Sequence, residues 1–194
     1  MKLWNLSALA ALTLSCQGQP TPEGSQVATP TINTKMETAI LASGCFWGTE
    51  YFLKRIDGVV STTVGYTGGF VENPTYEQVC TKRTGHYEAT EVVFDPSQTD
   101  YETVLRMFFE THDPTQTNGQ GPDIGPQYRS AIFYLNETQK ATAEKLMALL
   151  RAKGYAVATE LLPAAPFYSA EGYHQDYYDN KGGTPYCHGY RALF

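Results

Sequence analysis

The sequence predicts an α+β fold: a two-layer sandwich around a mixed, mostly antiparallel sheet, with a long irregular C-terminal segment. Short β-branched or apolar runs and longer amphipathic stretches follow one another between residues 36 and 161, and their order mixes hairpin-like steps with crossovers. The 194 residues include 42% hydrophobic and 13% aromatic side chains, which is enough for one buried core and argues against a second full domain. Beyond residue 162 the composition is mostly that of turns and loops.

The first 35 residues are expected to direct and tether the chain. Residues 1–15 have the order of a signal peptide, with one basic residue before an apolar run too short to span a bilayer permanently. Cys16 ends a segment similar to a bacterial lipobox, so residues 16–35 are predicted to be a lipid-anchor cysteine and a flexible tether rich in Gln, Pro, Thr, Ser and Gly. We therefore expect export to the periplasm or cell envelope, with anchoring by lipid on Cys16. Cleavage without lipidation and a buried N-terminal helix are the alternatives.

The domain is predicted to span residues 36–194 and to open with a strand, a turn and a helix. Residues 38–42 form a short apolar run suited to a buried strand, and Ser43-Gly44 breaks this run. An amphipathic stretch follows over residues 46–56. Cys45 is therefore expected at the turn between the strand and the helix.

The later elements are predicted from the same kinds of pattern. β-branched and apolar runs closed by Gly-Gly or Asp-Pro indicate strands, and apolar residues at helical spacing, or a stretch rich in Ala, Lys and Leu, indicate helices. In chain order these elements are a strand at 59–66, a strand at 89–94, a helix at 101–111, a strand at 130–135, a helix at 137–153, a strand at 156–161, and one or two helical turns at 174–180.

Charge and cysteine spacing exclude several classes of protein. The formal net charge is −6 and the 14 Lys and Arg residues are scattered, so nucleic acid is not an expected partner. The cysteines are too few and too widely spaced for a disulfide scaffold or a Cys-X2-Cys zinc site; they are Cys16, Cys45, Cys80 and Cys187. The four histidines match no metal-ligand spacing either, so no metal is expected, and His86 and His112 are predicted to make structural hydrogen bonds.

Cys45 has the local setting of a reactive thiol. A thiol attacks as its thiolate, and the N–H groups of a helix that begins directly after the cysteine stabilise that anion. Phe46 and Trp47 place two aromatic rings beside the sulfur, which suits a pocket for a small apolar group such as an S-methyl. From these residues alone, a small buried core cysteine remains the alternative reading of Cys45.

The motif around Cys45 resembles the active-site motif of the A-type methionine sulfoxide reductases, and further matches follow it in the family's order and spacing. Together they cover residues 38–187. The matching segments are Gly44-Cys45-Phe46-Trp47-Gly48, Gly65-Tyr66-Thr67-Gly68-Gly69, Asn73-Pro74-Thr75-Tyr76, Thr84-Gly85-His86-Tyr87-Glu88, His112-Asp113-Pro114, and Asp123 with Gln127-Tyr128-Arg129-Ser130-Ala131-Ile132.

The resemblance implies a role for each matching residue. Cys45 would attack the sulfoxide sulfur, Glu88 would donate a proton to the departing oxygen, and Cys187 would resolve the resulting sulfenic acid as a disulfide. The substrate-binding residues implied are Phe46 and Trp47 around the methyl group, Tyr76 and Tyr128 at the oxygen, and Asp123 in the polar network. Read alone, Glu88 fits a solvated strand residue and Asp123 a loop cap, while Cys80 is predicted to be a packing residue.

The resemblance also implies the partners. The expected substrate is methionine S-sulfoxide, in proteins and possibly free, so the function would be repair of oxidised proteins. No cofactor is implied, since a thioredoxin-like dithiol would reduce the Cys45–Cys187 disulfide, and a monomer is expected. Two other function classes stay open: a thiol peroxidase or thiol hydrolase with a Cys-His-Asp triad, and a lipid-tethered module that binds a methyl-bearing ligand without chemistry.

Overall fold

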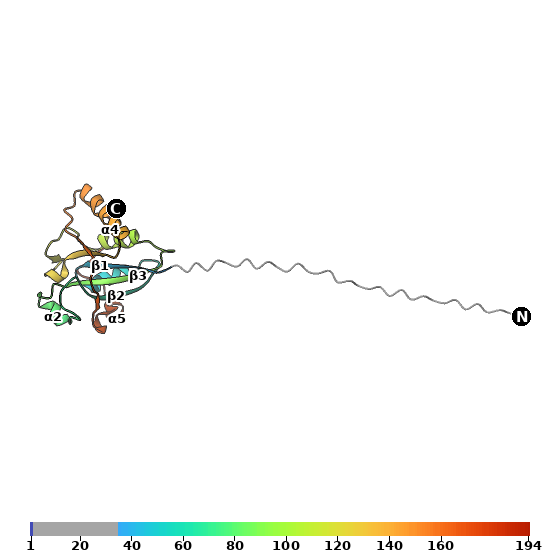
Figure 1. Ribbon diagram of the computed structural model, residues 1–194, viewed down its shortest axis with the longest axis horizontal. Helices are drawn as coiled ribbons and strands as arrows, with labels where there is room; N and C mark the ends of the chain where they lie inside the picture. Colours follow the sequence, from blue (N-terminus) through green and yellow to red (C-terminus); the bar gives the residue numbers. More distant parts are fainter. Residues whose placement is uncertain (2–34) are drawn as a thin grey trace. The chain divides into compact units, whose positions relative to one another are not determined.

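The computed structural model describes Met1 and residues 35–194, and the latter form a domain built on one mixed sheet (Figure 1). Neighbouring strands are antiparallel except for the parallel pair β6 and β7. The strands in sheet order are β7 (Glu160–Pro163), β6 (Ser130–Tyr134), β1 (Glu37–Ser43), β3 (Tyr87–Phe94), β2 (Val59–Thr67) and β8 (Tyr168–Ser169). The predicted α+β fold with a mixed, mostly antiparallel sheet is confirmed.

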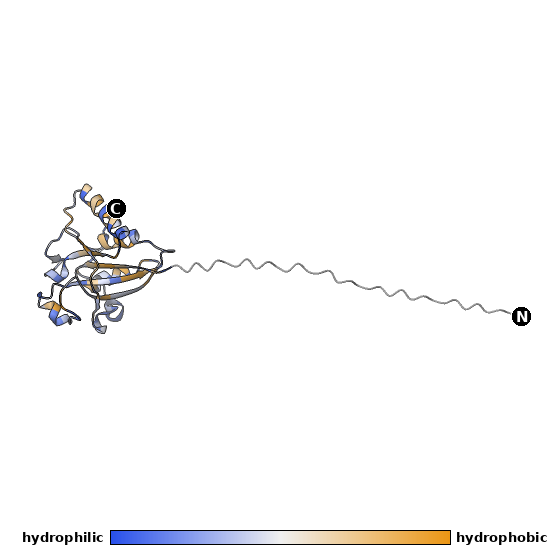
Figure 2. Ribbon diagram, viewed as in Figure 1, coloured by the Kyte–Doolittle hydropathy of each residue, from blue (hydrophilic) through white to orange (hydrophobic). Residues whose placement is uncertain are grey.

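Helices cover one face of the sheet. The core on this side joins strand residues such as Leu41 and Phe94 to helix residues such as Leu53, Phe108 and Leu146, all of them fully buried. The helices on this side are α1 (Phe46–Leu53), α3 (Tyr101–Glu110) and α4 (Glu137–Ala152). Figure 2 shows hydrophobic residues along much of the strands, while the helices carry both hydrophobic and hydrophilic residues. Burial of these apolar faces is the main source of the fold's stability.

The C-terminal segment covers the opposite face. Ile40, Ala89 and Phe133 form a second buried cluster there. Leu162 of β7 and Phe167, which follows β7, pack against this cluster. The central strands β1 and β3 are therefore covered on both faces, and most of their side chains are buried. A strand that is buried on both faces lacks the alternation of apolar and polar residues, so its sequence does not show which side chains point to which face.

Several short elements differ from the prediction. The last strand of the core was expected at 156–161 but β7 lies at Glu160–Pro163, because Ala158 N–H donates to the carbonyl of Pro114 at 2.7 Å and so belongs to a loop. The sequence did not indicate α2 (Tyr76–Cys80), β4 (Gly119–Gln120), β5 (Asp123–Ile124) or β8. The C-terminal helical turn is present as α5 (Tyr177–Lys181), after a 3₁₀ turn at Gly172–His174.

The predictions for the N-terminal segment fall on residues 2–34, which lie outside the described residues. These are the signal peptide at 1–15, the anchor residue Cys16 and its tether at 16–35, of which only Met1 and Lys35 are described. Within the described part of the chain, every helix is too short or too polar to cross a membrane.

Candidate active site

Cys45 lies at the turn between β1 and α1, as predicted, and is the N-cap residue of α1. The backbone N–H of Trp47 donates a hydrogen bond to the Cys45 sulfur and so favours its thiolate. Gly44 precedes it with φ of +100°, and a Cβ there would lie 2.4 Å from Cβ of Gln120. The turn that presents Cys45 therefore requires glycine at position 44.

Cys187 lies directly beside Cys45. Both are reduced, buried thiols, and the two Sγ atoms and a carboxylate oxygen of Asp123 all lie within 4.8 Å of one another. The hydrogen bond to Cys187, followed by burial, raises the pKa of the Cys45 thiol well above its usual value. The structure thus brings together the two cysteines that the family resemblance pairs, although 142 positions separate 45 from 187 in the chain.

Glu88 is a buried carboxyl held at the N-terminus of α1. It is 1% exposed, and Phe46 N–H donates to its Oε2 at 3.2 Å. Burial, and then the nearby Cys45, raise the pKa of Glu88 well above its usual value, against smaller opposing effects from Phe46 and the Tyr128 hydroxyl. A solvated strand residue, the alternative from sequence periodicity, is therefore wrong. Because β3 is covered on both faces, the carboxyl of Glu88 is enclosed.

Tyr76 and Tyr128 supply neutral hydroxyl groups to the same site. Burial is the largest cause that raises the pKa of each tyrosine far above neutrality. Tyr76 begins α2, and its backbone N–H donates to Glu171 Oε1 at 2.8 Å. Tyr128 ends a 3₁₀ turn at Pro126–Tyr128. Two short elements that the sequence did not indicate therefore position the two hydroxyls, which remain protonated donors at neutral pH.

Phe46 and Trp47 provide a buried and a half-buried aromatic ring beside Cys45. Phe46 is 1% exposed, and its ring centroid lies 5.1 Å from that of His174. Trp47 is half-buried, its Nε1–H donates to His174 Nδ1 at 3.0 Å, and its ring stacks on Tyr177 at 3.7 Å. Sequence reasoning missed His174 and Tyr177 as supports of Trp47. Only the high density of aromatic residues in the C-terminal segment hinted at them.

The hydrogen bond from Trp47 to His174 leads to a prediction for substrate binding. Trp47→Phe keeps an aromatic wall but removes the N–H group that fixes the ring. A hydrogen bond contributes about 0.5–1.5 kcal/mol net, so KM should rise by about two- to twelvefold while kcat changes little. Steady-state kinetics with methionine sulfoxide, the substrate that the motif resemblance implies, measure this. A fall in kcat with unchanged KM would show instead that Trp47 acts in the chemical step.

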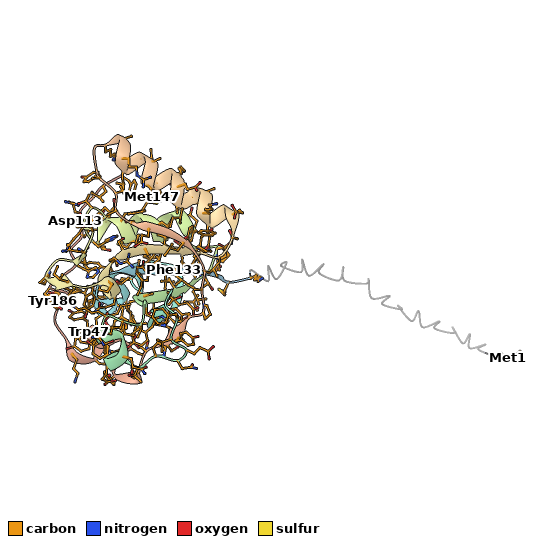
Figure 3. The ribbon with its side chains drawn as sticks, turned by 60° about the vertical axis from the view of Figure 1, so that its left-hand side comes forward. Met1, Trp47, Asp113, Phe133, Met147 and Tyr186 are labelled. Carbon is orange, nitrogen blue, oxygen red and sulfur yellow. The ribbon has the colours of Figure 1, made fainter. Side chains whose placement is uncertain are left out.

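Asp123 reaches the site from the short β4–β5 hairpin. Its carboxylate accepts hydrogen bonds from the Tyr186 hydroxyl at 3.0 and 3.1 Å, and its negative charge acts on both Cys45 and Glu88. Figure 3 shows Tyr186 and Trp47 toward the same side of the domain. Asp123 thus links the site to the residue just before Cys187, rather than serving only as a loop cap.

Cys80 is not a packing residue, and that prediction was wrong. Its side chain is exposed on α2, because the buried side of this short helix is formed by Val79. The Tyr76 hydroxyl donates a hydrogen bond to the Cys80 sulfur, one helical turn away. Cys80 is therefore connected to the site by its hydrogen bond with Tyr76.

Among the described residues, one cluster has the spacing of metal ligands, and it consists of Cys45, Asp123 and Cys187. Two of these ligands are the adjacent thiols. A metal bound there would prevent them from forming a disulfide, so the cluster is better suited to thiol chemistry than to a resident metal.

Comparisons with known proteins agree with this geometry. A sequence model of the family described as peptide methionine sulfoxide reductase matches residues 37–193. The peptide methionine sulfoxide reductase MsrA of Sulfolobus acidocaldarius is 54% identical over 153 residues, covering 78% of this chain and 87% of that protein. Saccharomyces cerevisiae Mxr1 in reduced form matches with a TM-score of 0.76 at 34% identity, covering 82% of this chain and 94% of that one. Mxr1 in complex with Trx2 matches with a TM-score of 0.55 at 25% identity, covering 82% and 92%.

The family match, the similar relative and the shared fold agree with the motifs around Cys45. The resemblance inferred from those motifs is confirmed. The chain belongs to the peptide methionine sulfoxide reductase family, A type.

Proposed function

We propose that this chain reduces the S epimer of methionine sulfoxide to methionine, in oxidised proteins and as the free amino acid. The observation that carries the proposal is the contact between the thiols of Cys45 and Cys187, with the buried carboxyl of Glu88 close enough for the charge of Cys45 to raise its pKa. Reduction of a sulfoxide needs a nucleophile for sulfur and a proton for the departing oxygen, and the first two groups supply them.

In the first step, Cys45 attacks the sulfoxide sulfur and Glu88 protonates the oxygen. The oxygen passes to Cys45, which becomes a sulfenic acid, and the substrate leaves as methionine; the proton of the Cys45 thiol replaces the one that Glu88 gave. The hydroxyls of Tyr76 and Tyr128 donate hydrogen bonds to the same oxygen. Phe46 and Trp47 surround the methyl group.

In the second step, Cys187 attacks the sulfenic sulfur of Cys45, forming a disulfide and releasing water. The contact between the two thiols supports this pairing. A thioredoxin-like dithiol then reduces the disulfide by thiol exchange, without a bound cofactor. The structure of Mxr1 in complex with Trx2 supports a donor of this type.

Separated epimers of dabsyl-methionine sulfoxide test the proposed function. With thioredoxin, thioredoxin reductase and NADPH, the S epimer should be consumed and the R epimer should not. Consumption of the R epimer alone, or of neither, would refute the proposal. Retained turnover in Glu88→Gln, with loss on changing a histidine, would favour a Cys-His-Asp thiol enzyme instead.

We also propose that the chain is exported and carries lipid on Cys16. The support is the sequence order of a signal segment over 1–15, a lipobox-like Cys16 and a polar tether. Mass spectrometry of the mature N-terminus from a bacterial host should find a first residue Cys16 with a diacyl or triacyl mass. An unmodified N-terminus at any residue after Cys16 would contradict lipid anchoring.

A further inference from the structure

We infer that His188 is the proton acceptor for Cys187 in the disulfide-forming step. This inference rests on the proposed function, in which Cys187 resolves the Cys45 sulfenic acid. His188 follows Cys187 directly in the chain, and its ring Nδ1 lies 3.1 Å from the Cys187 Sγ atom. The sequence motifs assign this histidine no role.

The partners of the other ring nitrogen, Nε2, allow the tautomer that this role requires. Ring Nε2 lies 3.3 Å from Ser43 Oγ, and the backbone of Ser43 also takes part in a hydrogen bond with His188. In our proposal the hydrogen of the neutral ring is on Nε2, where the Ser43 hydroxyl can accept it. Nδ1 then has a free lone pair, and it faces the Cys187 thiol.

A hydroxyl network fixes the ring relative to Cys45. Ser43 Oγ lies 2.7 Å from Thr49 Oγ1, and Thr49 Oγ1 donates to the Cys45 carbonyl at 3.3 Å. The ring also packs on the first turn of α1, where a Cβ on Gly48 would lie only 2.2 Å from Nδ1. Only glycine leaves room for the imidazole at this point. His188 is therefore held against the turn that carries Cys45 as well as beside Cys187.

The imidazole of His188 is neutral in the folded protein near physiological pH. It is 7% exposed, and burial, followed by the effect of His112, lowers the pKa of His188 to about 3. The titratable groups that face it are the Cys187 thiol and His112, whose own pKa burial lowers to about 4. Ring Nε2 also lies 3.3 Å from the hydroxyl of Ser43 and 3.5 Å from that of Thr49, and neither hydroxyl titrates near neutral pH. The lone pair on Nδ1 is thus available at all pH values at which the enzyme would work.

The step balances without another reactant. As the Cys187 sulfur bonds to the sulfenic sulfur of Cys45, the thiol proton moves to His188 Nδ1 and the S–OH bond of Cys45 breaks. The departing hydroxide takes the proton and leaves as water, so His188 returns to its neutral form. Because the low basicity of the ring disfavours a lasting imidazolium, the proton passes through His188 and is not stored there.

A single-turnover experiment separates this step from the first. Reduced full-length protein is mixed with excess methionine sulfoxide without reductant, and released methionine and lost thiols are measured over time from about pH 6 to about pH 8. In the wild type, disulfide formation should be nearly independent of pH and show a solvent deuterium isotope effect. If methionine is released but thiols disappear about tenfold faster per pH unit, without an isotope effect, this inference fails while the proposed function stands. If no methionine is released, the proposed function itself fails.

Two variants distinguish proton acceptance from mere positioning. His188→Asn places an amide near the position of Nδ1, and His188→Gln places one near Nε2; neither amide accepts a proton. Both should release one methionine per chain, yet form the disulfide about tenfold more slowly at neutral pH, since a base with a pKa of about 3 accelerates the step less than one matched to neutral pH. Their rates should then rise with pH, since only the thiolate remains reactive. A wild-type rate in either variant would overturn the inference.

His86→Asn is the matched control, because His86 is also buried but binds the backbone of Gly69 and Val71. It should leave the pH dependence of disulfide formation unchanged. If it changes that dependence as the His188 variants do, the effect comes from loss of a buried ring and the inference is overturned. If the His188 variants fold too poorly to release methionine, the wild-type pH and isotope measurements decide alone.

Discussion

Replacing Cys187 with serine is expected to leave the first turnover intact and to stop every later one when a thioredoxin-like protein is the only electron donor. The serine hydroxyl cannot form a disulfide with the Cys45 sulfenic acid, and thioredoxin reduces disulfides. Methionine released by the reduced variant should therefore reach one molecule per chain and stop. Quantitative chromatography of methionine, with and without thioredoxin, measures this.

Cys45→Ser is the matched comparison, because it removes the neighbouring thiol in the same buried site. It should release no methionine at all, since no nucleophile remains for the sulfoxide sulfur. Continuous turnover of Cys187→Ser with thioredoxin would contradict the assignment of Cys187. A first turnover in Cys45→Ser would contradict the assignment of Cys45.

Glu88→Gln is expected to lower kcat/KM by about 10²–10⁴-fold, the usual contribution of a general acid. Glutamine keeps the size of the side chain and can still accept the hydrogen bond from Phe46, but it has no acidic proton for the sulfoxide oxygen. In the wild type, kcat/KM should fall as the pH rises through the raised pKa of Glu88, because the ionised carboxylate cannot donate. This falling limb should be absent in the variant. If kcat/KM of Glu88→Gln still fell with rising pH, the general acid would be another group.

The same variant should be at least as stable as the wild type near neutral pH. Burial raises the pKa of Glu88 in the folded state, so the neutral carboxyl is the favoured form there. Its contribution to stability is fully present below the unfolded-state pKa of about 4.3 and is lost as the pH rises through the folded-state pKa. Thermal unfolding at several pH values should therefore show a smaller loss of stability with rising pH in Glu88→Gln than in the wild type.

Glu50→Gln provides a control for the removal of a buried carboxyl. Burial also raises the pKa of Glu50, but this residue receives hydrogen bonds from Thr62 and from the backbone of Asp176, outside the reacting groups. It should change the pH dependence of stability and leave that of kcat/KM unchanged. Loss of the alkaline limb in Glu50→Gln would show that this limb reports folding and not proton donation.

The parts of the site that could be predicted from sequence are those set by local pattern. An apolar run broken by Ser43-Gly44 before an amphipathic stretch is enough to place Cys45 at a strand-to-helix turn, and the structure confirms it. The family motifs then identified Glu88 and Cys187. Their proximity to Cys45 depends on the sheet and on the path of the C-terminal segment, and no local pattern contains this information.

The rest depended on tertiary contacts. Glu88 is enclosed because β3 is a central strand, which its alternation does not reveal. α2 has only five residues and depends on a capping box at Thr75, so its apolar pattern is too short to detect. His174 and His188 were read as dispersed histidines, yet one fixes Trp47 and the other contacts Cys187. Their roles follow from partners that are distant in sequence or hidden by burial.

Peptide mapping of the oxidised protein tests the central claim most directly. Reduced full-length protein should be incubated with methionine S-sulfoxide without any reductant, alkylated, digested and analysed by mass spectrometry, with methionine measured in the same sample. We predict one methionine per chain and one new disulfide, joining Cys45 to Cys187, with Cys80 alkylated as a free thiol. No released methionine, or a disulfide that joins Cys80 to either of the other two, would contradict the account.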